Sequence, residues 1–298
     1  MPVLSDERAP GAALRRTTAI AVLAVALAAC AGHGTGSQTE PTSTRSRRGS
    51  GATAPPLTSN TVTSTSTTVT TTTSASHRPL LGRVVHIDAG HDGGNFTHLA
   101  EIDRPVNIIT KTIDCDTTGT EGPDRYTESA FNLNVALRIR RMLESLGAKV
   151  VMTRTTDTGW GPCINQRAAI GNRSHADAAI SIHADGNDTS GNRGFHVIEP
   201  LDVPGHNDSI IQPSERLGRD VRAAFPSTGM PVSNYAGTDG IERRNDLGGL
   251  NFSQVPKVFI ECGNMHDPTD LALLESPEWR ERAALALADA ITTFLTSK

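Results

Sequence analysis

The chain has 298 residues and a formal net charge of −4, and 37% of its residues are hydrophobic while only 4% are aromatic. The near-neutral charge and the absence of a Lys/Arg stripe after residue 80 argue against a nucleic-acid-binding protein, which needs a concentrated basic surface. Residues 81–298 suffice to bury one substantial core, which excludes a small scaffold that depends on disulfides.

The first thirty residues have the features of a bacterial export signal. Arg15 and Arg16 precede an apolar run over 19–29, and small residues end this run directly before Cys30. The run is shorter than the roughly 20 apolar residues that span a bilayer, which excludes an integral membrane protein. Residues 27–30, Leu-Ala-Ala-Cys, resemble a lipobox. We therefore expect 1–30 to be a lipoprotein signal peptide with a lipid on Cys30; an ordinary cleaved signal peptide is the alternative.

A composition shift follows this signal. About half of residues 31–80 are Ser or Thr, and such a segment cannot bury enough apolar surface to offset the entropy lost on folding. We expect a disordered Thr/Ser-rich tether here. The protein is then exported to the cell envelope, and its only contact with the membrane is through the lipid on Cys30.

Residues 81–298 alternate between strand and helix patterns and form a single predicted domain. Helices are predicted at 127–146, 164–172, 214–225 and from 277 onward, and strands at 84–88, 106–113, 149–154, 178–183, 194–199 and 257–261, with 194–199 as an outer strand. The helix from 127 has one apolar stripe and ends at Gly147. This alternation predicts an α/β fold with a largely parallel or mixed sheet flanked by helices.

Polar side chains follow three of the predicted strands. His91, His183 and Glu261 stand where apolar runs end, and Glu128 opens the long helix. Because ligands bind at the carboxyl ends of strands in α/β sheets, these side chains can share one crevice. Two imidazoles and a carboxylate with an open fourth position are typical of catalytic zinc. The alternatives are that Glu128 complements the helix dipole and that the histidines only make hydrogen bonds in loops.

Four ordered segments carry a family resemblance. They read IDAGHDGG at 87–94, ESAFNL at 128–133, SIHAD at 181–185 and FIECGN at 259–264. Together they resemble the zinc-dependent N-acetylmuramoyl-L-alanine amidases, cell-wall hydrolases of the amidase_3 type, and most of all their actinobacterial and mycobacterial members. The resemblance covers 83–298. It departs from the family at Asp92, where a Gly is usual, and in a longer insertion at 95–127.

The resemblance implies a twisted mixed sheet with helices on both faces and one Zn²⁺ per chain, with His91, Glu128 and His183 as the ligands. It makes Glu261 the catalytic carboxylate, the general base toward a zinc-activated water and then the acid toward the leaving amine. The implied reaction is hydrolysis of the amide between the lactyl group of N-acetylmuramic acid and L-alanine, in peptidoglycan or its fragments, by a monomer. The alternatives are a non-catalytic cell-wall-binding lipoprotein and a zinc peptidase that cleaves within the stem peptide.

The remaining cysteines and arginines are interpreted structurally. In an oxidising compartment Cys115 and Cys163 are expected to form a disulfide that joins the insertion to the core, with free thiols as the alternative, and Cys262 is expected to be buried. We interpret Arg167 as tying loops together and Arg243-Arg244 as a solvated pair; the alternatives are that Arg167 binds substrate and that Arg243-Arg244 contact peptide carboxylates of the substrate. The sequence leaves open whether polymer or fragments are preferred, which stem-peptide modifications are accepted, and whether 95–127 controls access.

Overall fold

The computed structural model describes residues 78–297. The predicted signal peptide at 1–30, Cys30 and nearly all of the predicted tether at 31–80 lie outside the described residues. Leu80, assigned to the end of that tether, is buried in the core, and its backbone N–H donates to the carbonyl of Leu146 over 3.0 Å. Within 78–297, every helix is too short or too polar to cross a membrane.

One mixed sheet of six strands forms the centre of the described fold, with the strand order β4-β1-β5-β8-β6-β7. The strands are β1 (Val84–Ala89), β4 (Lys149–Met152), β5 (Ala178–Asp185), β6 (His196–Pro200), β7 (Ile241–Arg244) and β8 (Lys257–Asn264). Strands β4, β1, β5 and β8 are mutually parallel, whereas β6 pairs antiparallel with β8. The carboxyl ends of β1, β5 and β8 therefore meet at one edge.

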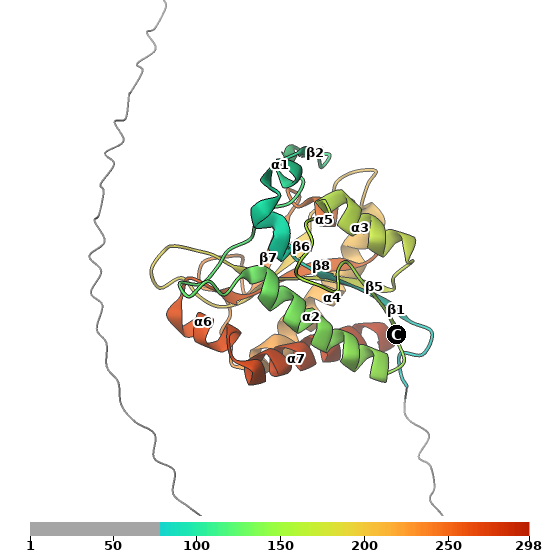
Figure 1. Ribbon diagram of the computed structural model, residues 1–298. Coiled ribbons are helices and arrows are strands. Elements are labelled where there is room, and N and C mark those ends of the chain that lie inside the picture. Colours follow the sequence, from blue (N-terminus) through green and yellow to red (C-terminus); the bar gives the residue numbers. More distant parts are fainter. Residues whose placement is uncertain (1–77, 298) are drawn as a thin grey trace, which may run out of the picture. The chain divides into compact units, whose positions relative to one another are not determined.

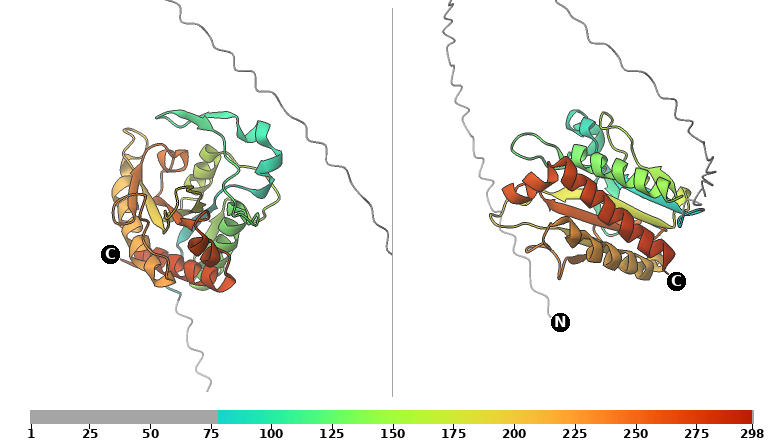
Figure 2. Two further views of the ribbon diagram at one scale, coloured as in Figure 1. Left: turned by 90° about the vertical axis from the view of Figure 1, so that its left-hand side faces the viewer. Right: turned by 90° about the horizontal axis from the view of Figure 1, so that it is seen from below.

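Helices cover both faces of this sheet, which confirms the predicted α/β class. Figure 2 shows three long helices side by side on one face: α2 (Glu128–Ser145), α7 (Pro277–Thr296) and α4 (Ile211–Ala224). Figure 1 shows α3 (Ile164–Arg173) and α5 (Gly248–Asn251) on the opposite face. The remaining α-helices of the described residues are α1 (Leu99–Ile102) and α6 (Pro268–Leu274). The apolar residues of α2 and α7 that face the sheet are buried with those of the strands in one core.

Helix α2 forms where the apolar stripe predicts it. The Thr127 hydroxyl accepts a hydrogen bond from the backbone N–H of Ala130 and caps the first turn. Phe131, Val135 and Ile139 are fully buried on one side, and Gly147 ends the segment at a φ of 101°, a conformation that glycine adopts without strain. This cap fixes the position of Glu128 as the first residue of the helix.

Two strand predictions are wrong. Residues 106–113 form not one strand but a hairpin of β2 (Pro105–Asn107) and β3 (Thr112–Asp114), because the chain turns back at Ile109, whose φ is +80°. The segment 194–199 is not the outer strand, because β7 pairs with β6 beyond it. The sequence of β7, Ile-Glu-Arg-Arg, has no alternating apolar pattern that would reveal a strand.

The insertion is attached covalently to the sheet-bearing part of the domain. Cys115, directly after β3, forms a disulfide with Cys163, the residue before α3. Cys262 lies in β8 and is fully buried among apolar side chains, as expected.

Candidate metal centre

Three side chains from three different elements converge at the carboxyl edge of the sheet. His91 follows β1, Glu128 opens α2 and His183 lies in β5, and their potential ligand atoms all lie within 4.8 Å of one another. The Glu128 carboxylate oxygen Oε1 lies 2.9 Å from His183 Nδ1 and 3.3 Å from His91 Nε2. The side chain of Glu128 therefore faces the imidazoles, and Thr127 makes the helix cap in its place.

Each of these groups is oriented by further contacts. Nδ1 of His91 lies 3.0 Å from the carbonyl oxygen of Thr117 and 3.3 Å from a carboxylate oxygen of Asp116, which leaves Nε2 pointing at Glu128. Glu128 Oε2 accepts the backbone N–H of Thr120 over 3.0 Å. A histidine that ligates a metal through one nitrogen commonly donates its other N–H to a carbonyl or carboxylate, and His91 has this arrangement.

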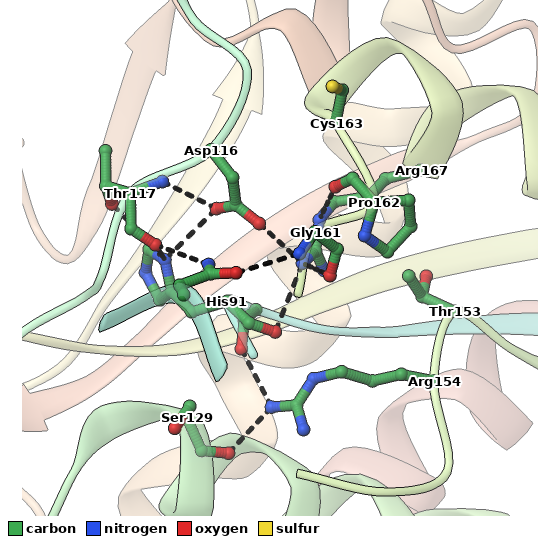
Figure 3. A network of polar contacts seen from close by, with 12 residues as sticks. His91, Asp116, Thr117, Ser129, Thr153, Arg154, Gly161, Pro162, Cys163 and Arg167 are labelled. Carbon is green, nitrogen blue, oxygen red and sulfur yellow. Dashed lines mark hydrogen bonds and ion pairs between the residues drawn. The ribbon is translucent and has the colours of Figure 1, made fainter. Parts of the chain in front are cut away.

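A buried arginine holds the backbone around His91 (Figure 3). The Arg167 guanidinium forms ion pairs with Asp88 at 3.0 Å and with Asp116 at 2.8 Å, and all three side chains are almost fully buried. It also donates to the carbonyl oxygens of Ala89 and His91. A buried ion pair is stable only when its remaining hydrogen-bonding groups are satisfied, and these contacts satisfy them. The expectation that Arg167 ties loops together is confirmed.

Glu261 lies beside this cluster on the neighbouring strand. Parallel pairing of β5 with β8 places it directly opposite His183, so the two side chains share one face of the sheet. Among residues 78–297, no hydrogen-bond partner reaches the buried oxygen Oε2 of Glu261. Burial, together with the nearby carboxylates of Glu128 and Asp185, raises the pKa of Glu261 well above its usual value.

The three-residue cluster fits a zinc ion. Ligand atoms at 2.0–2.1 Å from a tetrahedral zinc are separated by about 3.3 Å, and the contacts at 2.9 and 3.3 Å are close to this spacing. Burial opposes the charged form of His91, but Glu128 and Asp116 outweigh it and raise the pKa of His91 to about 10. The pKa of Glu128 is held well below its usual value, because both histidines outweigh the effect of burial. The site therefore attracts positive charge.

The structure adds residues that the sequence analysis missed. Asp116 and Thr117 contact His91, and the only signal for them was their position directly after Cys115. Arg244 lines the same cleft as Glu261 and pairs with Asp246 at 2.8 Å. The side chains of Arg243 and Arg244 are 52% and 35% exposed, in agreement with the interpretation as a solvated pair.

Comparisons with known proteins find relatives in both sequence and fold. A family model described as Amidase_3, N-acetylmuramoyl-L-alanine amidase, matches residues 85–293. The N-acetylmuramoyl-L-alanine amidase Rv3717 of Mycobacterium tuberculosis is 38% identical over 226 residues, which are 76% of this chain and 91% of that protein. The crystal structure of the amidase Ami1 from Mycobacterium smegmatis is 37% identical, has a TM-score of 0.68, and covers 74% of this chain and 99% of its own. Ami1 from Mycobacterium abscessus is 38% identical with a TM-score of 0.67, over 72% of this chain and 100% of its own.

Proposed function

Because the chain belongs to the N-acetylmuramoyl-L-alanine amidase family, it is an enzyme that hydrolyses peptidoglycan, and we propose that it does so with zinc and a glutamate base. The bond cleaved is the amide between the lactyl group of N-acetylmuramic acid and L-alanine of the stem peptide, in the polymer or its fragments. The observation that carries the zinc and glutamate assignment is the convergence of His91, Glu128 and His183 beside the unpartnered carboxyl of Glu261.

In this proposal His91, Glu128 and His183 hold one Zn²⁺. The contact of His91 Nδ1 with the Thr117 carbonyl supports this assignment, because it leaves Nε2 facing the other two ligands. The bound ion supplies a Lewis acid that polarises a carbonyl and lowers the pKa of water to about 7.

Glu261 moves the proton in the reaction. Its carboxylate takes a proton from the attacking water as the C–O bond forms, and it returns that proton to the nitrogen of L-alanine as the C–N bond breaks. The products are an N-acetylmuramic acid carboxylate and a stem peptide with a free amino terminus.

Replacing Glu261 by Gln tests this role. The substitution keeps the shape of the side chain and removes its capacity to accept a proton, so we expect hydrolysis to fall on the order of 10²–10⁴-fold while the fold and the zinc content stay unchanged. The measurement is digestion of muropeptides followed by mass analysis, with metal content measured in parallel. Wild-type activity in Glu261→Gln would reject the role of Glu261.

The same digestion separates the alternatives. Stem peptides that begin with L-alanine support the amidase, whereas internal peptide fragments indicate a zinc peptidase. Wall binding without any cleavage product indicates a non-catalytic lipoprotein.

Removing the metal tests the zinc site. Treatment with a chelator is expected to abolish hydrolysis, and adding Zn²⁺ in a ratio of one per chain is expected to restore it. The His183→Ala variant is the matched control, because Zn²⁺ is not expected to restore its activity. Undiminished hydrolysis in metal-free protein would overturn the proposed metal dependence.

We also propose that the protein is exported and works at the cell envelope as a monomer, anchored through a lipid on Cys30. A relative from Staphylococcus epidermidis, 23% identical over 75% of this chain, is named a probable cell wall amidase, and this name supports an extracellular site of action. The expected result is that wild-type protein incorporates a labelled fatty acid and that Cys30→Ala does not. Sedimentation of the soluble domain is expected to give the mass of one chain.

A further inference from the structure

An apolar pocket opens beside the metal-ligand cluster. Its volume is about 240 Å³, and it lies between the β2–β3 hairpin, α3 and α5. Its apolar walls come from Ile113, Ile164, Leu247 and Phe259. The pocket is smaller than the roughly 300–1,000 Å³ that encloses a drug-sized ligand, so it fits one part of a substrate.

The walls of this pocket are closely packed. A Cβ on Gly248 would lie 2.7 Å from Ile108 and 2.9 Å from Ile164, closer than real Cβ atoms approach their neighbours. Helix α5 therefore packs directly against the insertion and α3 beside the pocket.

A second cavity, of about 310 Å³, also borders the cluster and is lined by its three residues. The two cavities share His91, Thr117, His183, Leu247 and Phe259. The first is also lined by Asp88, Asp114, Asp116 and Arg167, but most of its exposed surface is apolar. Glu128, Asp185, Arg244 and Glu261 line only the second, whose exposed surface is about half polar. Both cavities border the metal-ligand cluster: the first forms the apolar half of the groove, and the second, which holds Glu261, Asp185 and Arg244, forms its charged half.

This difference fixes the direction in which a substrate lies, on the premise of the proposed amidase function. The proton returned to L-alanine comes from Glu261, so the leaving nitrogen and the peptide beyond it must lie in the charged half. The acyl side of the scissile amide then points into the other half. We propose that the apolar pocket binds the lactyl methyl and the adjacent face of the N-acetylmuramoyl group.

The chemistry of the two substrate halves matches the two cavities. The acyl side presents methyl groups, which gain free energy when apolar walls remove them from water. The peptide side presents amide N–H groups, for which carboxylates are acceptors. A methyl group placed against Asp185 and Glu261 would gain nothing and would desolvate charge.

The experiment couples a change in the pocket to a change in the substrate. One substrate is N-acetylmuramoyl-L-alanyl-D-isoglutamine, and its partner lacks only the lactyl methyl. Because one methyl in an apolar pocket is worth about tenfold or more in specificity, we expect wild type to prefer the first substrate about tenfold in kcat/KM. Ile113→Trp fills the pocket from the half-buried hairpin residue, and we expect it to lower this preference to near one.

A structural defect would lower kcat/KM for both substrates equally and leave the preference unchanged, so the ratio isolates the pocket. Ile164→Phe fills the pocket from α3 and serves if Ile113→Trp does not fold. Leu285→Ala, at an exposed residue of α7, is the control and keeps the wild-type preference.

Two outcomes overturn the proposal: a wild-type preference near one, and an unchanged preference in both filled variants. A third substrate has its peptide shortened from two residues to one. We expect this shortening to change kcat/KM by the same factor in wild type and in Ile113→Trp. If Ile113→Trp changed the effect of peptide length and left the effect of the methyl unchanged, the peptide and not the acyl group would lie in the apolar pocket. Absence of any cleavage by wild type would instead reject the proposed function itself.

Discussion

The residues of the site are held in two different ways. His183 and Glu261 lie on adjacent parallel strands and are placed by strand register. His91 lies after β1 at a φ of +54°, and its surroundings are held by Arg167, Asp116 and the disulfide. Side chains placed by strand pairing keep their positions as long as the sheet is folded. Side chains placed by buried ion pairs lose their positions when one member of the ion-pair network is replaced. The second region should therefore be the more sensitive to single substitutions.

Removing Arg167 is expected to have the largest effect on stability. Arg167→Ala leaves Asp116 as a buried carboxylate without its cation, and breaking such a pair costs about 3–5 kcal/mol. The measurement is the free energy of unfolding in urea. Arg141→Ala is the matched control, because Arg141 and its partner Glu281 are 67% and 51% exposed and an exposed pair is worth about 1 kcal/mol or less. Equal losses in the two variants would contradict the role assigned to the network.

Opening the disulfide is expected to have the next largest effect. Cys115 and Cys163 close a loop with a sequence separation of 48, and a disulfide of this kind contributes about 2–4 kcal/mol through restriction of the unfolded chain. The paired Cys115→Ser and Cys163→Ser variant should lose this free energy of unfolding under oxidising conditions. Added reductant should destabilise wild type and leave the paired variant unchanged; a variant as stable as oxidised wild type would refute the prediction.

Asp116→Asn tests the contact between the network and the metal ligand. The substitution removes the charge near Nδ1 of His91 while the Thr117 carbonyl remains. Loss of an outer contact to a ligating histidine lowers metal affinity by about 10–100-fold, and the remaining carbonyl places our expectation near tenfold. Zinc affinity is measured by competition with a chelator. Asp114→Asn, at an exposed residue of the same hairpin, should keep the wild-type affinity.

The same contrast explains what the sequence reveals. Helix α2 and strands β5 and β8 follow regular apolar patterns, which reveal where each element begins or ends. His183 and Glu261 could therefore be selected from the sequence as candidate site residues. The contact of Asp116 with His91 depends on the path of the chain through the insertion and on the disulfide, and no local pattern encodes either. The hairpin was missed because Ile109 gives no turn signal, since β-branched residues rarely adopt a positive φ.

Ser181→Ala changes a residue of the sheet and is compared with Asp116→Asn in the buried network. We expect its effect to be the smallest of those described. The Ser181 hydroxyl donates to Asp88 over 2.8 Å, two residues before His183 in the same strand. Its loss should lower the free energy of unfolding by about 1 kcal/mol, because Asp88 keeps its pairs with Arg167 and Lys257. Pairing of β5 with both neighbours still fixes His183, so zinc affinity should stay within about twofold of wild type. A tenfold loss of affinity, as large as that expected for Asp116→Asn, would show that the buried network positions His183 as well as His91.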